Sequence, residues 1–559
     1  MTETDSRHEQ RFPVLEPAAL EAAMRFTSGP VHVFAPGEVV FGIGDLESPV
    51  WLIIEGSIIA VRRDGLGHEK MIVTQTAGQF TGEVSQLAGR ASLAQGTAGP
   101  EGCTAAPIDA AHLRALMIGS ADIGEVVMRA LILRRVGLIE GGSAGSVLVG
   151  RPGDANLLRL QGFLTRNGYP NTLLDADSDA EGRAIVERLG VAAEDLPLMV
   201  CPNGTVLNRP SETEAAICLG MTPDLDPAKV YDVAIVGAGP AGLATAVYAA
   251  SEGLSVLVLD QRAIGGQAGA SARIENYLGF PTGISGQALA GRAYNQALKF
   301  GAELAIPLEV ARMDCASDGL GHPHRLELTD GQIVCARTVV VASGARYRRP
   351  DIENLAPFEG SGVSYWASPV EARLCAGEEV ALVGGGNSAG QAVIFLASKV
   401  KALNLVVRGA GLEASMSRYL IDRIAALPNV TIHTHTEVTA LEGDLNSGLV
   451  GAVFRDRRTG ETHRRDLHHL FLFVGADPNA AWLQGCVTLD DKGFVNTGTS
   501  SLSLQTDRAG VFAIGDVRAG STKRVAAAVG EGAAVVSQIH QYLASLDDEA
   551  RANREGTGS

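Results

Sequence analysis

A chain of 559 residues with 46% hydrophobic content is long enough for about three or four domains, each with its own buried core. Its formal net charge of −17 argues against nucleic acid or an anionic membrane as the main partner. The polar N-terminus has no apolar signal core, and no apolar run approaches the ~20 residues of a membrane helix, so we expect a cytoplasmic protein.

The seven cysteines are scattered along the chain, and none forms a C-x-x-C pair. An odd, dispersed set in a cytoplasmic chain is typical of buried thiols. We therefore expect neither a disulfide framework nor a metal site.

Residues 1–141 alternate short apolar runs with glycines and end in a helical pattern at 121–140. This pattern predicts a small β-barrel or jelly roll. The segment resembles the cyclic-nucleotide-binding domain family through four motifs: Phe34-x-x-Gly37-Glu38, Gly44-Asp45, Trp51-Leu52-Ile53-Ile54 with Gly56, and Phe80-Thr81-Gly82-Glu83.

This resemblance implies that the turn at Gly82 holds a cyclic phosphate, that Glu83 binds the ribose 2′-hydroxyl and that Arg90 pairs with the phosphate. Backbone amides and a guanidinium suit a phosphodiester. The run after Arg90, Ala-Ser-Leu-Ala, matches the family only loosely. The residues leave open a second interpretation, in which the barrel serves packing or dimerisation and binds no ligand.

Residues 142–227, entered through a predicted linker at 141–146, follow the order βαβαββα, which resembles the thioredoxin and glutaredoxin fold. Pro197 stands where that family has a cis-proline. In place of the family's C-x-x-C stands Arg151-Pro-Gly-Asp154, so no thiolate is available there for disulfide exchange. We interpret Cys201 as a buried small hydrophobe and the domain as a thiol-free adaptor.

Residues 230–260 predict an apolar strand, a glycine turn, a helix of small residues and a second apolar strand that ends in an acid. Gly237, Gly239 and Gly242 fit G-x-G-x-x-G, which lets a pyrophosphate approach the helix N-terminus. Asp260 follows at the spacing of an acid that binds a ribose. Together they predict a dinucleotide site.

A second unit of this kind begins at Gly384-Gly-Gly386, and the chain returns to the first unit at Gly515-Asp516. The predicted fold class is therefore multidomain: a β jelly-roll barrel, a thioredoxin-like α/β domain and two nested Rossmann-like three-layer α/β domains. The predicted bounds are 1–141, 142–227, 228–347 with 472–548, and 348–471, followed by a flexible tail at 549–559.

The nested pair resembles the low-molecular-weight thioredoxin reductase family. The resemblance implies a homodimer, FAD in the first unit, a nicotinamide nucleotide in the second, and an electron acceptor such as a small redox protein. The implied FAD residues are Gly237, Gly239, Pro240, Ala241, Gly242, Asp260, Gly266, Gln267, Asn276, Gly344, Gly515, Asp516, Arg524, Val525 and Ala526. The implied nicotinamide-nucleotide residues are Gly384, Gly386, Asn387, Ser388, Ala389 and Arg408.

Arg408 stands where the family holds the 2′-phosphate of NADPH. Gly409 and Glu413 replace the family's further arginines, although Arg418 is near enough in sequence to fold back. One guanidinium still suits a phosphate, so we predict NADPH, with NADH as the alternative.

The segment before the second glycine turn departs from the family. Where the family carries C-A-T-C, this chain has Trp366-Ala-Ser-Pro369, and neither end residue can form a mixed disulfide. Cys375 is close in sequence, but with no visible base beside it we interpret it as a packing residue.

The residues leave three functional hypotheses. The first is an FAD-dependent NAD(P)H oxidoreductase, in which hydride passes from NADPH to flavin and on to an unknown acceptor, under regulation by a cyclic nucleotide. The second is a thioredoxin-disulfide or low-molecular-weight disulfide reductase, with thiols from the substrate or from Cys375. The third is a cyclic-nucleotide or redox sensor whose turnover is incidental.

Overall fold

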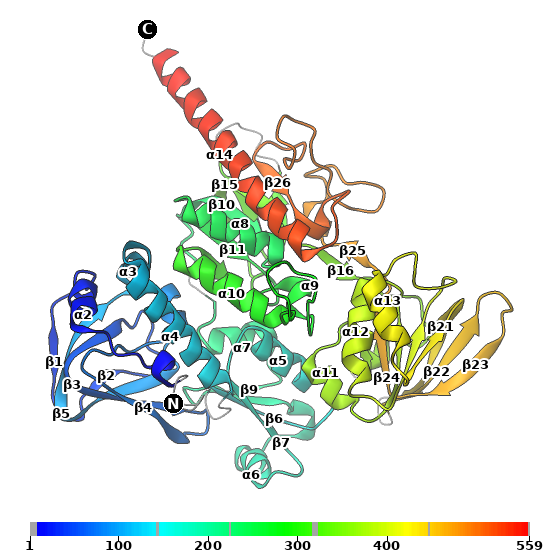
Figure 1. The fold of residues 1–559 in the computed structure, drawn as a ribbon, viewed down its shortest axis with the longest axis horizontal. Helices are drawn as coiled ribbons and strands as arrows, with labels where there is room; N and C mark the ends of the chain where they lie inside the picture. The colour runs from blue at the N-terminus through cyan, green and yellow to red at the C-terminus, as the bar shows by residue number, and fades with distance from the viewer. Residues whose placement is uncertain are drawn as a thin grey trace.

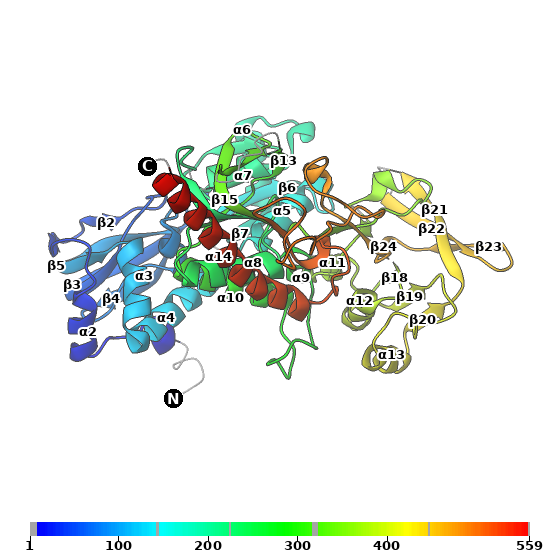
Figure 2. The same cartoon turned by 90° about the horizontal axis from the view of Figure 1, so that it is seen from above.

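The structure is a computed structural model that describes residues 8–140, 145–222, 225–315, 322–360, 362–444 and 448–556. It has four units: an N-terminal unit (8–140), a middle unit (145–222), a large unit (225–347 and 476–556) and an inserted unit (348–475). The N-terminal and inserted units lie at opposite ends of the long axis, with the other two between them (Figures 1 and 2).

The N-terminal unit is built on an antiparallel sheet in the order β1-β5-β3-β4, with β2 also paired to β5. Neighbouring residues of β3 face opposite sides: Leu52 packs with the helices, and Ile53 packs in a separate cluster on the other face. The elements are α2 (Pro17–Met24), β1 (His32–Phe34), β2 (Val39–Phe41), β3 (Val50–Arg63), β4 (Glu69–Thr76), η1 (Val84–Ala88), β5 (Ala94–Ile108), α3 (Ala110–Gly119) and α4 (Ala121–Glu140).

The middle unit has a four-stranded sheet in the order β7-β6-β8-β9, in which only the pair of β6 and β7 is parallel. The element order is the predicted one, and the peptide bond before Pro197 is cis as predicted. The elements are β6 (Ser146–Gly150), α5 (Ala155–Arg166), β7 (Asn171–Asp175), α6 (Ala180–Leu189), η2 (Ala193–Asp195), β8 (Leu198–Val200), β9 (Val206–Asn208) and α7 (Glu212–Cys218).

The large unit has a seven-stranded sheet whose parallel core is β12-β11-β10-β15, with β26 also paired to β15. Ile235 of β10 packs in one hydrophobic cluster and its neighbour Val236 in another, so the strand is buried on both faces. Its elements before the insertion are β10 (Val230–Val236), α8 (Pro240–Ser251), β11 (Val256–Leu259), α9 (Gly266–Gly269), α10 (Gly286–Lys299), β12 (Glu303–Ala305), β13 (Val310–Asp314), β14 (His324–Leu328), β15 (Ile333–Val341) and β16 (Ala345–Tyr347). After it come β25 (Ala476–Pro478), η4 (Ala481–Leu483), β26 (Val511–Ala513), η5 (Gly515–Val517) and α14 (Val525–Gly556).

The inserted unit has a five-stranded parallel sheet, β17-β24-β18-β19-β20, and a three-stranded antiparallel one, β21-β22-β23. The chain enters and leaves it through β16 and β25, which pair antiparallel. Its elements are η3 (Ala356–Phe358), β17 (Val363–Ser364), α11 (Pro369–Leu374), β18 (Glu379–Val383), α12 (Asn387–Ala397), β19 (Ala402–Val406), α13 (Arg418–Ala425), β20 (Val430–His433), β21 (Thr436–Asp444), β22 (Gly448–Asp456), β23 (Thr462–Asp466) and β24 (His469–Leu472).

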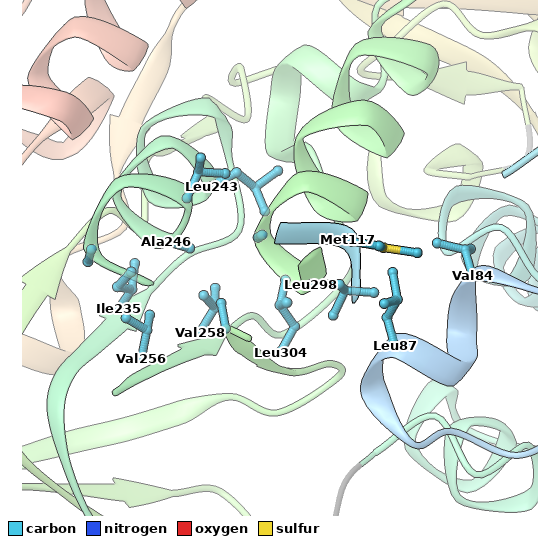
Figure 3. Close-up of a cluster of buried hydrophobic side chains, with 14 of the residues drawn as sticks. Val84, Leu87, Met117, Ile235, Leu243, Ala246, Val256, Val258, Leu298 and Leu304 are labelled. Atoms are coloured by element: carbon cyan, nitrogen blue, oxygen red, sulfur yellow. The ribbon is translucent and has the colours of Figure 1, made fainter. Parts of the chain in front are cut away.

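One hydrophobic cluster crosses the boundary between the N-terminal and large units. Figure 3 shows Leu298 and Leu304 of the large unit between Val258 on one side and Leu87 and Met117 of the N-terminal unit on the other. All five side chains are almost completely buried. The burial of these apolar side chains stabilises the contact between the two units, in the same way that burial of apolar side chains stabilises the core of a single domain.

The expectation that the cysteines are mostly thiols is wrong. Cys201 and Cys218 form a disulfide with their Cα atoms 6.4 Å apart, and Cys315 and Cys486 form another with their Cα atoms 5.5 Å apart. Both cysteines of the middle unit are in the first disulfide, so neither is a free thiol and Cys201 is not merely a buried small hydrophobe. Each pair joins a strand end to a segment that only tertiary packing brings beside it, which spacing in the sequence did not reveal.

Residues 549–556 of the predicted tail belong to α14, which continues as a helix to Gly556. Residues 141–144 of the predicted linker and residues 557–559 lie outside the described residues. No helix in the described part of the chain has both the length and the apolar character that a bilayer span needs.

Candidate functional site

A cavity of about 840 Å³ lies where the large, inserted and middle units meet. Most of the predicted binding residues line it. They are Gly237, Gly239, Pro240, Ala241, Asp260, Gly266, Gln267, Asn276, Gly344, Asn387, Ser388, Gly515, Asp516, Arg524, Val525 and Ala526. The predicted residues Gly242, Gly384, Gly386, Ala389 and Arg408 are not among its lining residues.

The first glycine turn has the geometry that its sequence predicts. Gly237 has φ +115°, and a Cβ there would overlap the carbonyl oxygen of Ala342. A Cβ on Gly242 would overlap the carbonyl oxygen of Gly237, whereas one on Gly239 would meet no atom within 4 Å. Gly239 caps α8 and Pro240 is its first residue, so the open side of the turn faces the cavity at a helix N-terminus.

Asp260 ties the turn to the end of β11. Its carboxylate accepts the amides of Ala238 at 2.8 Å, Arg262 at 2.8 Å and Ala263 at 3.1 Å. Burial raises the pKa of Asp260, the three amides and Arg262 lower it, and the net direction is upward. The side chain is thus held rigidly at the cavity wall, where an acid can bind a ribose.

Asp516 also lines the cavity, before the start of α14. Burial raises the pKa of this half-buried carboxyl group, Lys523 lowers it and Glu531 raises it, with a net upward direction. No residue of the described chain donates a hydrogen bond to its carboxylate. A carboxylate with free acceptor sites suits the hydroxyls of a polyol chain.

The second glycine turn reaches the cavity through the start of α12. Gly386 caps this helix, and Asn387 and Ser388 line the cavity. Arg408 is exposed just beyond β19. Arg418 does not fold back towards it, because its guanidinium pairs with Asp422 at 2.8 Å on the exposed face of α13.

The segment that replaces the dithiol is a helix start. Ser368 precedes Pro369, the first residue of α11, and Glu371 accepts the Ser368 amide at 3.0 Å, as in a capping box. Glu371 also accepts the indole N–H of Trp366 at 2.8 Å, which holds this ring at the cavity wall. No cysteine from the described ranges lines the cavity.

Arg166 is a site residue that the sequence did not identify. It is the last residue of α5 in the middle unit, and its guanidinium carbon lies 4.6 Å from the centroid of the Trp366 ring. Both residues line the cavity. Burial lowers the pKa of Arg166, Glu371 raises it and Arg262 lowers it, with a net downward direction.

The middle unit is anchored beside Arg166 by two hydrogen bonds to the large unit. The Asn167 side chain donates to the carbonyl of Arg262 at 3.0 Å, and Gln287 donates to the carbonyl of Thr165 at 2.9 Å. Because these contacts join residues far apart in the chain, no local pattern predicts that Arg166 enters the cavity.

Cys375 is fully buried, as the packing interpretation predicts. Burial raises the pKa of its thiol to about 11, and the nearby Glu378 and Glu371 raise it further, against one opposing backbone hydrogen bond. It lies outside the cavity lining. Nothing in this environment activates the thiol as a nucleophile.

The predicted cyclic-nucleotide residues lie in the turn 82–90 of the N-terminal unit, at the boundary with the large unit. Glu83 accepts the amide of Ser85 at 3.1 Å and pairs with Arg135 at 3.5 Å. Arg90 donates to the backbone carbonyl of Leu304 at 2.9 Å. Both predicted ligand side chains are therefore engaged by the protein itself.

A family model described as pyridine nucleotide-disulphide oxidoreductase matches residues 231–532, which is more than half of the chain. The chain belongs to this family. It is a flavin-dependent NAD(P)H oxidoreductase of the thioredoxin reductase type. A second model, described as cyclic nucleotide-binding domain, matches residues 31–119, so an oxidoreductase is fused to such a domain.

The chain is similar to several curated proteins over this region. It is 32% identical to a thioredoxin reductase of Mycolicibacterium smegmatis over 318 residues, which cover 57% of this chain and 98% of that protein. It is also 32% identical to one subunit of the alkyl hydroperoxide reductase of Escherichia coli over 320 residues, which cover 57% of this chain and only 60% of that protein.

Two solved thioredoxin reductases have a similar fold. That of Lactococcus lactis, in its FR conformation, has a TM-score of 0.52 at 25% identity, and that of T. acidophilum has a TM-score of 0.51 at 29% identity. Each match covers 56% of this chain and 99% of the solved one.

Two glycine variants distinguish a glycine that is needed for flavin binding from one that is needed for packing of the turn. Gly242→Ala should lower the free energy of unfolding of the flavin-free protein by roughly 2 kcal/mol or more, because its Cβ overlaps backbone. Gly239→Ala should change it by no more than about 1 kcal/mol, the usual cost of losing a glycine N-cap, yet weaken flavin binding at least about tenfold. Denaturant unfolding and flavin fluorescence titration measure the two effects. A Gly239→Ala protein that binds flavin normally contradicts the assignment of this turn.

The thiol of Cys375 should react with iodoacetamide about 100-fold more slowly than an ordinary cysteine at pH 8. Its pKa of about 11 keeps it protonated there, and its labelling should accelerate as the pH rises towards that value. Cys335, a half-buried free thiol of the same protein, is the internal control. Peptide mass spectrometry measures both rates, and equal rates would show that Cys375 is accessible and ionised.

Proposed function

We propose that this protein is an FAD-dependent NADPH oxidoreductase that passes electrons to an external acceptor at the flavin cavity itself. One observation carries this proposal. A single cavity joins Asp260, Asp516 and the start of α8 in the large unit to the start of α12 in the inserted unit, with Trp366 in the place of a dithiol.

The cavity residues fit FAD. The start of α8 with Gly239 would hold the pyrophosphate, Asp260 the adenosine ribose and Asp516 the ribityl hydroxyls, while Val525 and Ala526 at the start of α14 would lie beside the ring system. When bound, FAD supplies the hydride-accepting and electron-donating chemistry of the reaction. The protein contributes orientation, a helix N-terminus for the phosphates and two acids for the hydroxyls.

The residues of the inserted unit support NADPH as the reductant. The start of α12 would bind its pyrophosphate, and the exposed Arg408 would bind its 2′-phosphate. The fused N-terminal unit would bind a cyclic nucleotide through Gly82, Glu83 and Arg90. A homodimer in the cytoplasm is part of the same proposal.

The acceptor would meet Trp366 and Arg166 rather than a thiol pair. The Glu371 carboxylate fixes the indole, and the guanidinium above it makes no hydrogen bond to any described residue. A guanidinium with unfilled donors favours an acceptor with a carboxylate, phosphate or sulfonate group. A small anionic redox protein or an anionic small molecule satisfies this requirement.

Anaerobic stopped-flow mixing of the flavin-loaded protein with NADPH should bleach the flavin absorbance within seconds. The reduced protein is then offered thioredoxin, ferredoxin, a low-molecular-weight disulfide, oxygen, naphthoquinone and naphthoquinone sulfonate. Naphthoquinone sulfonate should exceed neutral naphthoquinone in kcat/KM, and Arg166→Ala should reduce this preference about tenfold, the usual value of one charge-assisted hydrogen bond.

Two outcomes of this experiment count against the proposal. No bleaching with either NADPH or NADH would leave only a sensor role. Disulfide reduction that is lost in Cys375→Ser would assign the reaction to a buried thiol and not to the cavity.

Arg408→Ala should raise the apparent Kd of NADPH about tenfold to 100-fold and leave that of NADH within about twofold, because only NADPH carries the 2′-phosphate. Arg418→Ala is the matched control, since its guanidinium is paired with Asp422. Stopped-flow reduction at several nucleotide concentrations gives both constants. An equal change for the two nucleotides would remove Arg408 from phosphate recognition.

A further inference from the structure

The turn 82–90 of the N-terminal unit lies at a junction of three units. Val84 and Leu87 of η1 belong to the same hydrophobic cluster as Leu298 and Leu304 of the large unit. In Figure 3, Leu87 lies beside Leu298 of the large unit, and Val84 lies beside Met117 of its own unit. The segment expected to hold a cyclic phosphate is thus part of an interface within the chain.

Arg90 is the polar centre of the junction. Its guanidinium donates to the carbonyl of Leu304 at 2.9 Å and lies 5.8 Å from the ring centroid of Tyr294 in α10. Burial lowers the pKa of Arg90, while Tyr294, Tyr169 of the middle unit and Glu83 raise it, and the net direction is upward. One charged side chain of the N-terminal unit is therefore stabilised by both neighbouring units.

Several backbone amides of the turn are also in use. The amide of Glu83 donates to Gln86 at 2.9 Å, and the amide of Ser85 donates to Glu83 at 3.1 Å. Arg135 contacts Glu83 at 3.5 Å, and its guanidinium lies 4.8 Å from the ring centroid of Tyr169. A phosphate at this turn needs backbone amides and the Arg90 guanidinium. The amides of Glu83 and Ser85 and one guanidinium nitrogen of Arg90 already have partners within the protein.

We infer that docking of the N-terminal unit and binding of a cyclic nucleotide at Glu83 and Arg90 exclude each other. The anion would take the place that the Leu304 carbonyl and the Tyr294 ring occupy beside Arg90. A ligand that binds only the undocked arrangement shifts the equilibrium towards that arrangement. The size of the shift is set by the difference between the ligand's affinities for the docked and undocked arrangements. The cyclic nucleotide therefore releases the turn from the large unit.

The junction connects directly to the flavin site. Leu304 and Ala305 of β12 pair with Val258 and Leu259 of β11. The amide of Asp260, the acid at the cavity wall, donates to the carbonyl of Ala305 at 3.3 Å. Release of Arg90 removes a hydrogen bond from the carbonyl of Leu304. Its neighbour Ala305 is the residue that accepts the amide of Asp260. This regulatory role rests on the proposed function of the cavity.

Isothermal calorimetry of the flavin-loaded full chain with cyclic AMP and with cyclic GMP tests the inference. Tyr294→Ala removes the ring beside Arg90 from the large unit and leaves the residues of the turn itself unchanged. It should bind one of the two nucleotides about fivefold to tenfold more tightly than the wild type, as the loss of one competing cation–π contact predicts. Tyr248→Ala is the control, because Tyr248 is exposed on α8.

Hydrogen–deuterium exchange reports docking separately. In the wild type, a saturating nucleotide should increase exchange in the segments that contain Leu87 and Leu304. Tyr294→Ala should show increased exchange without ligand. Where Tyr294→Ala leaves exchange unchanged, Tyr294→Lys places an ammonium opposite Arg90 and opens the junction by like-charge repulsion.

Three results would overturn the inference: equal affinity in the wild type and in a Tyr294 variant whose exchange shows an open turn, no binding by such a variant, or saturation of the wild type with no change in exchange. Flavin reduction by NADPH is recorded on the same samples. A protein that keeps the expected affinity order but is not reduced by NADPH contradicts the proposed function and leaves this inference intact.

Discussion

The carboxylate of Asp260 is the interaction on which the site depends. Its oxygens accept three backbone amides, its own amide donates to Ala305, and its carbonyl accepts the amide of Leu308. It therefore holds the glycine turn, the end of β11 and the strand β12 in one arrangement. Backbone amides that would otherwise lack partners at a strand end are satisfied by this single side chain. Asp260 also connects the cavity to the junction at Arg90, because its amide donates to Ala305 and Arg90 donates to the neighbouring Leu304 on β12.

The replacement of the dithiol is a change of local structure as well as of chemistry. Ser368, Pro369 and Glu371 build a helix start, and the same Glu371 orients Trp366. Arg166 then covers the indole from another unit. A segment that carries thiols in the related family serves here as a rigid wall with an unfilled guanidinium beside it. This arrangement is why we place electron transfer to the acceptor at the cavity and not at a protein disulfide.

The predictions that depended on local geometry were largely right. Gly237 has the positive φ that its motif requires, the order of elements in the middle unit is the predicted one, and Asn387 begins the second helix where the second glycine turn placed it. The predictions that failed concerned long-range contacts. The partners of Cys201 and Cys315 were missed. The contact of Arg90 with a carbonyl of the large unit was also outside what any motif indicates, whereas its pairing with a phosphate stays a prediction.

The sequence by itself determined both glycine turns, the acids Asp260 and Asp516 beside them and the absence of a cysteine pair at Trp366 and Pro369, because tight turns and strand ends are set by residues a few positions apart. Tertiary structure alone decided that Arg166 enters the cavity, that cysteines far apart in the chain pair, and that the turn 82–90 docks on β12. These features depend on the burial of apolar surface within and between units, which brings together residues that lie from 17 to more than 200 positions apart in the chain.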